Sequence, residues 1–197
     1  MDLPGVGENL QDQPNNNFIL QSTSTFNGTM AYAAFGSIAD IFRTIPKFNI
    51  SSWAITTSIA NNNSIPVSSI TQLFNIQYGL LNSGVPDAES IIGTTLNFGF
   101  GPSEVLASAY WLLMPFSRGN IHITSSDPSV LPTINPNYFL IDFDLEVQIA
   151  IAKWTRSFWL TSPISDFATE SSPGFDALPL NATASQWRDY ITTTCKC

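Results

Sequence analysis

The first side chain in this sequence that could do acid–base chemistry is its single histidine, His122. In the sequence, no serine or cysteine nucleophile and no orienting acid stands in an obvious position to work with it. Catalysis by a general base requires partners that are positioned around it. We therefore interpret His122 as a structural residue.

A second group of reactive side chains is the acidic run Asp142, Asp144 and Glu146. These acids precede an apolar pattern with the period of a helix, and acidic side chains are favourable at the positive end of the helix dipole. We interpret the run as the start of a helix and not as an acid–base pair.

The two cysteines, Cys195 and Cys197, stand at the end of the sequence with one residue between them. A disulfide across so short a separation is strained, and no cluster of histidine and cysteine elsewhere completes a metal site. We expect incidental thiols in a frayed tail, and no metal.

The segment Gly5–Leu10 begins like the glycine-rich turn that binds a dinucleotide. Its third glycine is replaced by Leu10, no strand pattern precedes it, and no helical pattern follows. A true fingerprint needs all three, because the pyrophosphate binds at the helix N-terminus. We reject this segment as a dinucleotide site.

The length of 197 residues is that of about one domain. Charged residues make up 11 % of it, well below the about 25 % of ordinary soluble domains. The net charge is −8 and the basic residues are scattered, which argues against a nucleic-acid or anionic-membrane partner. No apolar run reaches the roughly 20 residues of a membrane span.

The sequence contains four N-glycosylation sequons, which begin at Asn27, Asn49, Asn62 and Asn181. Together with the abundance of uncharged polar residues, they favour a secreted protein. The opening residues Met1–Gly5 lack the basic and apolar regions of a signal peptide. We therefore expect this chain to be a fragment of a secreted parent protein.

Helices are predicted at three places. Thr29 can cap a helix that runs to about Phe42, and apolar residues from Val147 to Phe158 recur at helical spacing. The sequence from Thr183 to Gln186 forms a capping box that leads into Trp187. Residues 47–70 remain unassigned.

Strands are predicted where β-branched and aromatic residues lie between glycine and proline, at 73–78 and 91–100. A strand pair is expected from 110–114 and 121–124, in which Ile121 and Ile123 share the buried face. Residues 131–134 resume in extended form. Strands with segregated helices and no βαβ rhythm predict an α+β fold, with an antiparallel sheet and helices packed on one face.

Two stretches of the sequence, Asp2–Gln13 and Trp111–Phe139, are distinctive motif blocks. The first resembles the D-L-P-G-V-G-x-N-L-x-D-H/Q sequence of the glucose–methanol–choline (GMC) oxidoreductases, where the chain leaves the FAD domain for the substrate domain. The stretch Trp111–Phe139 resembles the run P-x-S/T-R-G through D-P to P-x-I-x-x-x-Y-F/L of the substrate domain. The two blocks occur in the order of the family.

The resemblance implies that the chain has three parts. Residues 1–13 are a remnant of the domain junction, residues 14–191 form a substrate-binding domain, and residues 192–197 are a tail that matches nothing in the family. The FAD-binding Rossmann half would be largely absent. The family oxidises CH–OH groups of small alcohols or sugars and passes hydride to FAD, with a histidine in a C-terminal H-x-x-G-T-type segment as the base. That segment is not found here, so no catalytic residue is assigned.

Four residues receive roles by the same resemblance. Trp111 corresponds to a tryptophan that lines the substrate pocket in the glucose-oxidising branch; the alternative is a core residue. Asn9, Asp12 and Gln13 lie near the domain junction and contact flavin or, alternatively, stabilise their own loop.

We expect the chain alone to be inactive, to retain no FAD, and to self-associate through the exposed domain junction. The alternative is a non-catalytic secreted glycoprotein that kept the substrate domain as a binding module.

Overall fold

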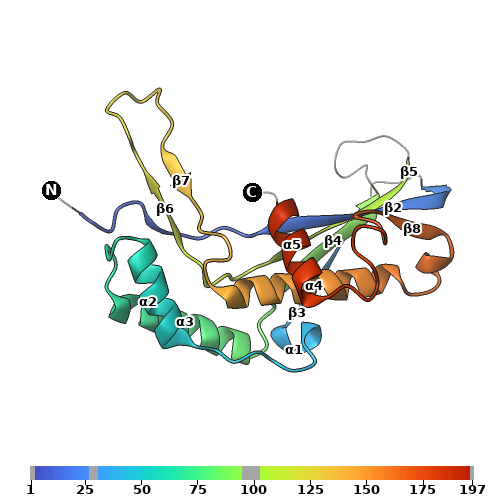
Figure 1. The fold of residues 1–197 in the computed structure, drawn as a ribbon, viewed down its shortest axis with the longest axis horizontal. Helices are drawn as coiled ribbons and strands as arrows, with labels where there is room; N and C mark the ends of the chain where they lie inside the picture. Colours follow the sequence, from blue (N-terminus) through green and yellow to red (C-terminus); the bar gives the residue numbers. More distant parts are fainter. Residues whose placement is uncertain (1–2, 27–30, 95–102, 196–197) are drawn as a thin grey trace.

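A computed structural model describes residues 3–26, 31–94 and 103–195. It contains a five-stranded sheet, a three-stranded sheet and helices gathered on one side (Figure 1). The larger sheet has the order β3-β4-β5-β2-β8, and each neighbouring pair is antiparallel. Its strands are β2 Asn15–Phe26, β3 Ala31–Gly36, β4 Ala88–Thr94, β5 Ser103–Leu112 and β8 Ala168–Ser172.

One face of this sheet forms the core together with two helices, α4 (Asp142–Trp159) and α5 (Ala184–Thr194). Alternate residues of β5 point to it, so Ser108 and Tyr110 are fully buried there. Trp159 of α4 donates to the Ser108 hydroxyl at 2.9 Å. On β2, the amide of Asn16 donates to the Ile191 carbonyl of α5 at 3.1 Å. Both helices therefore lie on the same face, and the predicted α+β architecture is confirmed.

The smaller sheet has the order β1-β6-β7 and is formed by β1 Glu8–Leu10, β6 Gly119–His122 and β7 Thr133–Asn135. The β6–β7 hairpin projects away from the body, while α2 (Ile50–Ala60) and α3 (Val67–Asn82) pack as a pair beside it (Figure 1). Two short helices, α1 (Ile38–Ile41) and the 3-10 helix η2 (Ile164–Asp166), complete the described elements.

The helices predicted from periodicity and capping are confirmed where the signals were strongest. Val147 and Ile151 of α4 are fully buried. Thr183 caps α5 through the expected box with Gln186.

The helix predicted over 29–42 is wrong, because Ala31–Gly36 pairs with β4 along its whole length and only Ile38–Ile41 is helical. Residues 27–30 at its start lie outside the described residues. The strand predicted over 73–78 is also wrong. There, Ile70, Phe74 and Leu81 are buried at helical spacing against the core, so α3 runs through the segment.

The predicted strand pair is corrected in a different way. Residues 110–112 belong to the large sheet and 119–122 to the small one, and β6 pairs with β1 and β7 instead of β5. Its expected buried face is open, since Ile121 is 38 % and Ile123 is 85 % exposed. The prediction for 91–100 is confirmed up to Thr94, where β4 ends; residues 95–100 lie outside the described part.

Candidate functional site

Trp111 lies on the face of the large sheet that points away from α4, here called the outer face. None of the helices in the described ranges is seen packed there in Figure 1. In the neighbouring strands Trp111 stands opposite Glu89 and Asn15. Its Nε1 donates to Glu89 Oε2 at 2.9 Å, which fixes the plane of the half-buried indole. The central strand therefore presents an oriented aromatic ring away from the main core.

Small side chains continue this face beside the tryptophan. Ala109 and Ala107 of β5 are both buried, and Ala109 stands opposite Ile91 and Asn17 in the adjacent strands. Both alanines are covered by their neighbours, whereas Trp111 stays partly exposed. An aromatic ring beside a carboxylate suits a flat ligand with hydroxyl groups.

The chain leaves β5 through a bend at Leu113–Arg118, here called the strap, whose backbone is bound by buried side chains. Asp87 accepts from the Met114 backbone N–H at 2.9 Å. Asp144 of α4 accepts from Phe116 and Ser117 at 2.8 and 2.6 Å. The acidic run thus begins helix α4, as expected, but one of its members also anchors the strap.

Arg118, at the end of the strap, points its side chain into the protein interior towards α3. It is 3 % exposed, donates to Gln77 Oε1 at 2.9 Å, and lies over the Phe74 ring at 5.5 Å from the ring centre. The next residue must be glycine, because a Cβ on Gly119 would lie 1.9 Å from the Asn135 carbonyl oxygen. The Ser-Arg-Gly motif therefore has a structural explanation.

Burial shifts the acidity of these groups. It raises the pKa of Asp87 to about 8, where nearby Asp144 adds a like charge. It raises the pKa of Asp144 to about 6, although hydrogen bonds from Ser117 and Phe116 and the Arg118 charge oppose that rise. Burial also lowers the pKa of Arg118 to about 10. Sequence reasoning missed Asp87, since a lone acid before a strand carries no signal of its buried partners.

The two motif blocks contact each other. Gln11 donates to the Pro115 carbonyl at 3.0 Å and Gln13 to the Leu113 carbonyl at 3.4 Å, while the Tyr138 hydroxyl donates to Asp12. Asp12 and Gln13 are therefore brought beside the strap that follows Trp111. Asn9 is exposed in β1, with a positive φ of 63°, and belongs to the other sheet.

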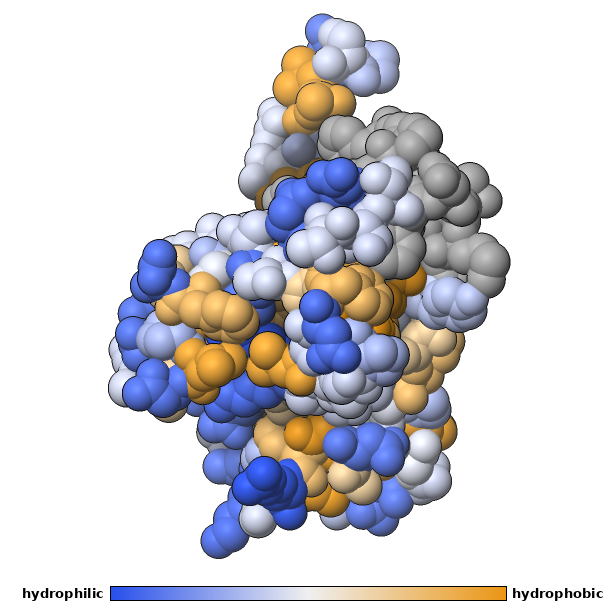
Figure 2. All heavy atoms as spheres, turned by 90° about the vertical axis from the view of Figure 1, so that its right-hand side faces the viewer, coloured by the Kyte–Doolittle hydropathy of each residue, from blue (hydrophilic) through white to orange (hydrophobic). Residues whose placement is uncertain are grey.

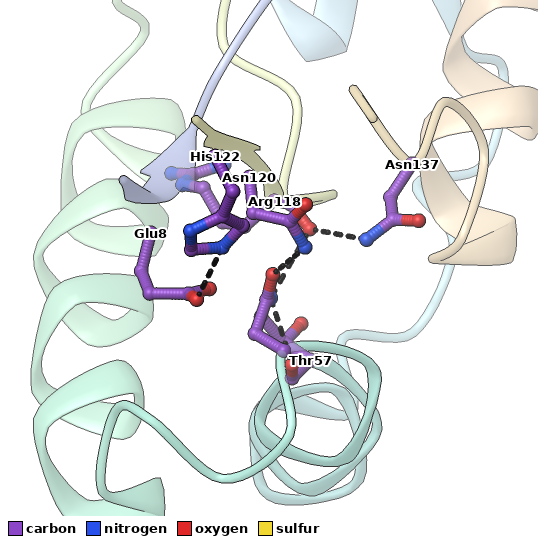
Figure 3. A network of polar contacts seen from close by, with 7 residues as sticks. Glu8, Thr57, Arg118, Asn120, His122 and Asn137 are labelled. Carbon is purple, nitrogen blue, oxygen red and sulfur yellow. Dashed lines mark hydrogen bonds and ion pairs between the residues drawn. The ribbon is translucent and has the colours of Figure 1, made fainter. Parts of the chain in front are cut away.

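His122 has an acidic partner that the sequence did not reveal. Its Nε2 lies 2.9 Å from Glu8 Oε1, and Figure 3 shows the ring directed at this carboxylate. The Glu8 side chain is only 3 % exposed, whereas His122 is 48 % exposed. The expectation that no orienting acid was present is thus wrong. The pair lies in the small sheet and not on the outer face.

Side-chain amides continue the network beside this pair (Figure 3). Asn120 donates to Asn61 Oδ1 at 3.0 Å, and Asn61 and Asn137 both donate to the Arg118 carbonyl. These bonds join the small sheet to α2 and to the strap. They hold the start of β6 against the end of α2.

The glycine-rich segment Gly5–Leu10, which begins like a dinucleotide-binding turn, packs against β6. Gly7 has a φ of +87°, and a Cβ there would lie 2.1 Å from the Ile121 carbonyl oxygen. Strand β1 follows it, not a helix. The residues of this turn therefore do not fit a pyrophosphate, which needs the N–H groups of a helix N-terminus.

The remaining predicted positions are distributed over the surface. Asn49, Asn62 and Asn181 are exposed, and Asn27 lies outside the described residues. Cys195 is partly buried at the end of α5, and Cys197 lies outside the described residues. Within the described ranges, no group of three or more histidine, cysteine or acidic side chains could hold a metal, and no helix has the length and apolarity to cross a membrane.

Comparison with known proteins identifies relatives of this arrangement. Residues 115–196 match the family model described as GMC oxidoreductase. The glucose oxidase-like protein fsoC of Humicola fuscoatra is 32 % identical over 98 % of this chain and 32 % of its own length. A glucose oxidase of Aspergillus carbonarius is also 32 % identical, over 97 % of this chain and 31 % of its own.

Solved structures share the fold. A fungal aryl-alcohol oxidase superposes with a TM-score of 0.72 at 19 % identity, over 96 % of this chain and 37 % of its own. An FAD-dependent oxidoreductase from Chaetomium thermophilum gives 0.68 at 17 % identity, over 98 % and 37 %. The chain spans about a third of the length of the curated relatives it matches. It belongs to the GMC oxidoreductase family.

Proposed function

We propose that this chain provides the substrate-binding surface of an FAD-dependent oxidoreductase that oxidises a CH–OH group of a small alcohol or sugar. The observation that carries the proposal is Trp111, held by Glu89 on the outer face of the central strand. An indole face packs against the apolar face of a sugar or against an aryl ring. The second carboxylate oxygen of Glu89 and the amide NH₂ of Asn15 can hydrogen-bond to hydroxyl groups of the same ligand.

In this proposal residues 14–191 are the substrate-binding unit and residues 1–13 its junction. Asp12 and Gln13 hold the junction against the strap, since Tyr138 and the Leu113 carbonyl already engage them. That engagement supports a role in the loop over a direct contact with flavin. Asn9 is exposed and remains the proposed flavin contact of the three.

FAD supplies the hydride acceptor in this chemistry when it is bound. The described residues do not form a site for the FAD pyrophosphate, so we derive no step through FAD and place the binding of its pyrophosphate outside the described residues. No catalytic residue is assigned here, because His122 is paired with Glu8 in the other sheet. The chain alone is then a binding unit without turnover.

The test is a chimera with the glucose oxidase-like protein of Humicola fuscoatra, whose own flavin content is measured first. In the Humicola fuscoatra protein, the third that aligns with this chain is replaced by residues 3–195. We expect the chimera to retain flavin and to oxidise an alcohol or a sugar. Replacing Trp111 with alanine should lower kcat/KM at least about fivefold, since ring packing is worth about 1 kcal/mol beyond its area, while bound flavin is unchanged.

Two controls sharpen this test. Trp111→Phe keeps an aromatic face but loses the bond to Glu89, so it should fall between wild type and alanine. Full turnover by the alanine variant would refute the assignment of the outer face. A flavin-loaded chimera without turnover on any alcohol or sugar would instead favour the non-catalytic binding module.

A further inference from the structure

A pocket lies on the other side of the large sheet from Trp111, between the α1 segment 39–43 and one side of α4. This pocket, here called the α4 pocket, has a volume of about 540 Å³, which is the size of a site for a small ligand. We propose that the α4 pocket binds a neutral saccharide, at a site separate from the one around Trp111. The inference does not depend on the proposed reaction.

The floor of the α4 pocket is apolar and carries an indole ring. Five residues at helical spacing share the side of α4 that lines it: Glu146, Ile149, Ala150, Lys153 and Trp154. The ring of Trp154 is half-buried, and its Cη2 lies 3.6 Å from the place of a Cβ on Gly36 in β3. Its Nε1 makes no hydrogen bond within the described ranges. Trp154 therefore offers a ring held beside the sheet and a donor that is not yet used.

Four charged side chains stand around this floor, two of each sign. Asp40 and Arg43 come from the α1 segment, Glu146 and Lys153 from α4, and all four are exposed. The whole chain has only 7 Lys and Arg and 15 Asp and Glu. Apolar side chains are exposed elsewhere too, as the end of the molecule seen in Figure 2 shows, so apolar surface alone does not mark a site. The gathering of scarce charges around an indole distinguishes this pocket.

Two of the four charges are already held in place by the protein. Asp40 Oδ2 accepts from the Ser37 hydroxyl at 2.7 Å and from its backbone N–H at 2.8 Å. These two hydrogen bonds lower the pKa of Asp40, so its carboxylate stays ionised at neutral pH. Lys153 Nζ lies over the Trp187 ring, 5.6 Å from the ring centre. Because both groups are positioned in advance, a ligand that binds them has less side-chain entropy to remove.

The other two charges have hydrogen-bonding capacity left. Arg43 makes no hydrogen bond or ion pair with the residues that the structure describes, although a guanidinium has five donors. Glu146 accepts no hydrogen bond from them either, and its charge acts on Arg188 only through space. The pocket therefore offers a cationic donor and an anionic acceptor to a ligand.

This mixture of charges selects the class of ligand. A hydroxyl group both donates and accepts, so a ligand with several hydroxyls can bond to carboxylates and to cations at once. A simple anion or cation would instead meet two like charges around the pocket. The apolar face of a sugar ring also packs against an indole. A neutral saccharide therefore satisfies the floor and the charges together.

The sheet separates this pocket from the site around Trp111. Trp111 points from β5 to the outer face, whereas α4 packs on the inner face, where Trp159 donates to Ser108. A saccharide in the α4 pocket thus leaves the outer face accessible. Binding there would hold the protein on a polysaccharide without occupying Trp111.

The test is isothermal titration of the full chain of 197 residues with cellohexaose, maltohexaose and xylohexaose. We expect at least one of them to bind saturably and to change the tryptophan fluorescence. Arg43→Met and Glu146→Met should each weaken binding about tenfold, since each removes hydrogen bonds to a charged group. The matched control is Lys47→Met, which also removes an exposed cation but lies outside the pocket, and it should bind like the wild-type chain.

Two further variants identify the site. Trp154→Phe keeps an aromatic ring, so it should still bind in the titration but lose most of the fluorescence change. Trp111→Ala should bind the saccharide as the wild-type chain does, whatever its effect on the proposed reaction. Circular dichroism checks that each variant is folded. If the chain alone is not monodisperse, the same titrations are made with the chimera in the Trp111→Ala background.

Three results would overturn the proposal. The first is that none of the three saccharides binds saturably to the wild-type chain. The second is equal affinity of the wild-type chain and Arg43→Met, or loss of binding in Trp111→Ala, which would place the saccharide on the outer face. The third is binding of hexagalacturonate or of phenylalanine but of no neutral saccharide, since the ligand would then be an anion or a zwitterion.

Discussion

The buried ion pair between Arg156 of α4 and Glu170 of β8 permits a quantitative test of what joins the helix layer to the sheet edge. Nε donates to Oε2 at 2.7 Å and Nη2 to Oε1 at 2.5 Å, with the side chains 4 % and 3 % exposed. The guanidinium also donates to the Leu178 carbonyl at 2.6 Å. Loss of either partner leaves the other charge buried without compensation.

We predict that Glu170→Met or Arg156→Met alone lowers the free energy of unfolding by about 3–5 kcal/mol. The double methionine variant removes both charges together, so its main cost is the unsatisfied Leu178 carbonyl, about 1–3 kcal/mol. The double variant should then be more stable than either single variant, with a coupling energy of at least about 3 kcal/mol. Urea unfolding followed by circular dichroism at 25 °C measures all three.

The matched control is the surface pair of Arg188 and Asp142, whose side chains are 42 % and 65 % exposed. Arg188→Met should cost less than about 1 kcal/mol, because solvent screens an exposed pair. If the costs of the two buried single variants simply add in the double variant, within about 0.5 kcal/mol, the pair is not coupled as described. That result would refute the reasoning.

Three further predictions concern the strap and the glycines. Because burial raises the pKa of Asp87 to about 8 and of Asp144 to about 6, the folded chain binds protons more tightly than the unfolded chain. The stability that these groups contribute is therefore full below pH of about 4 and is lost as the pH rises through 6 and 8. In thermal melts, the Tm of the wild-type chain should fall between pH 6 and 8, and Asp87→Asn should make this fall smaller. A Tm that falls equally steeply in both proteins would contradict the prediction. Gly119→Ala should cost more than about 3 kcal/mol in urea unfolding, since its Cβ meets the Asn135 carbonyl at 1.9 Å; a mild loss would argue against that approach. Gly79→Ala in α3 meets nothing within 4 Å and should stabilise the chain by about 0.5–1 kcal/mol in the same assay, whereas destabilisation would show an unforeseen contact.

Helices α4 and α5 could be predicted because their signals are local: an amphipathic period in one, a capping box in the other. The two wrong elements lack such signals. Residues 31–36 are a strand only because β4 pairs with them, and α3 is identified by which side chains the core buries. In both, tertiary contacts override a weak local preference.

The site could be predicted only in part. Trp111 and the stretch from Asn9 to Gln13 were found by resemblance, but pairing with Glu89 depends on the register between β4 and β5. The pairing of His122 with Glu8 likewise depends on β1 lying beside β6. Such contacts join residues far apart in the sequence, so spacing along the chain carries no sign of them.

The distinctive motif of this chain concerns architecture more than catalysis. Ser117, Arg118 and Gly119 bond to or pack against the chain's own backbone and buried side chains. Their presence therefore indicates a correctly formed strap, and a chain that had lost all activity would still need them to fold. Evidence for the reaction has to come from residues that the fold does not require, and Trp111 on the outer face is the first to examine.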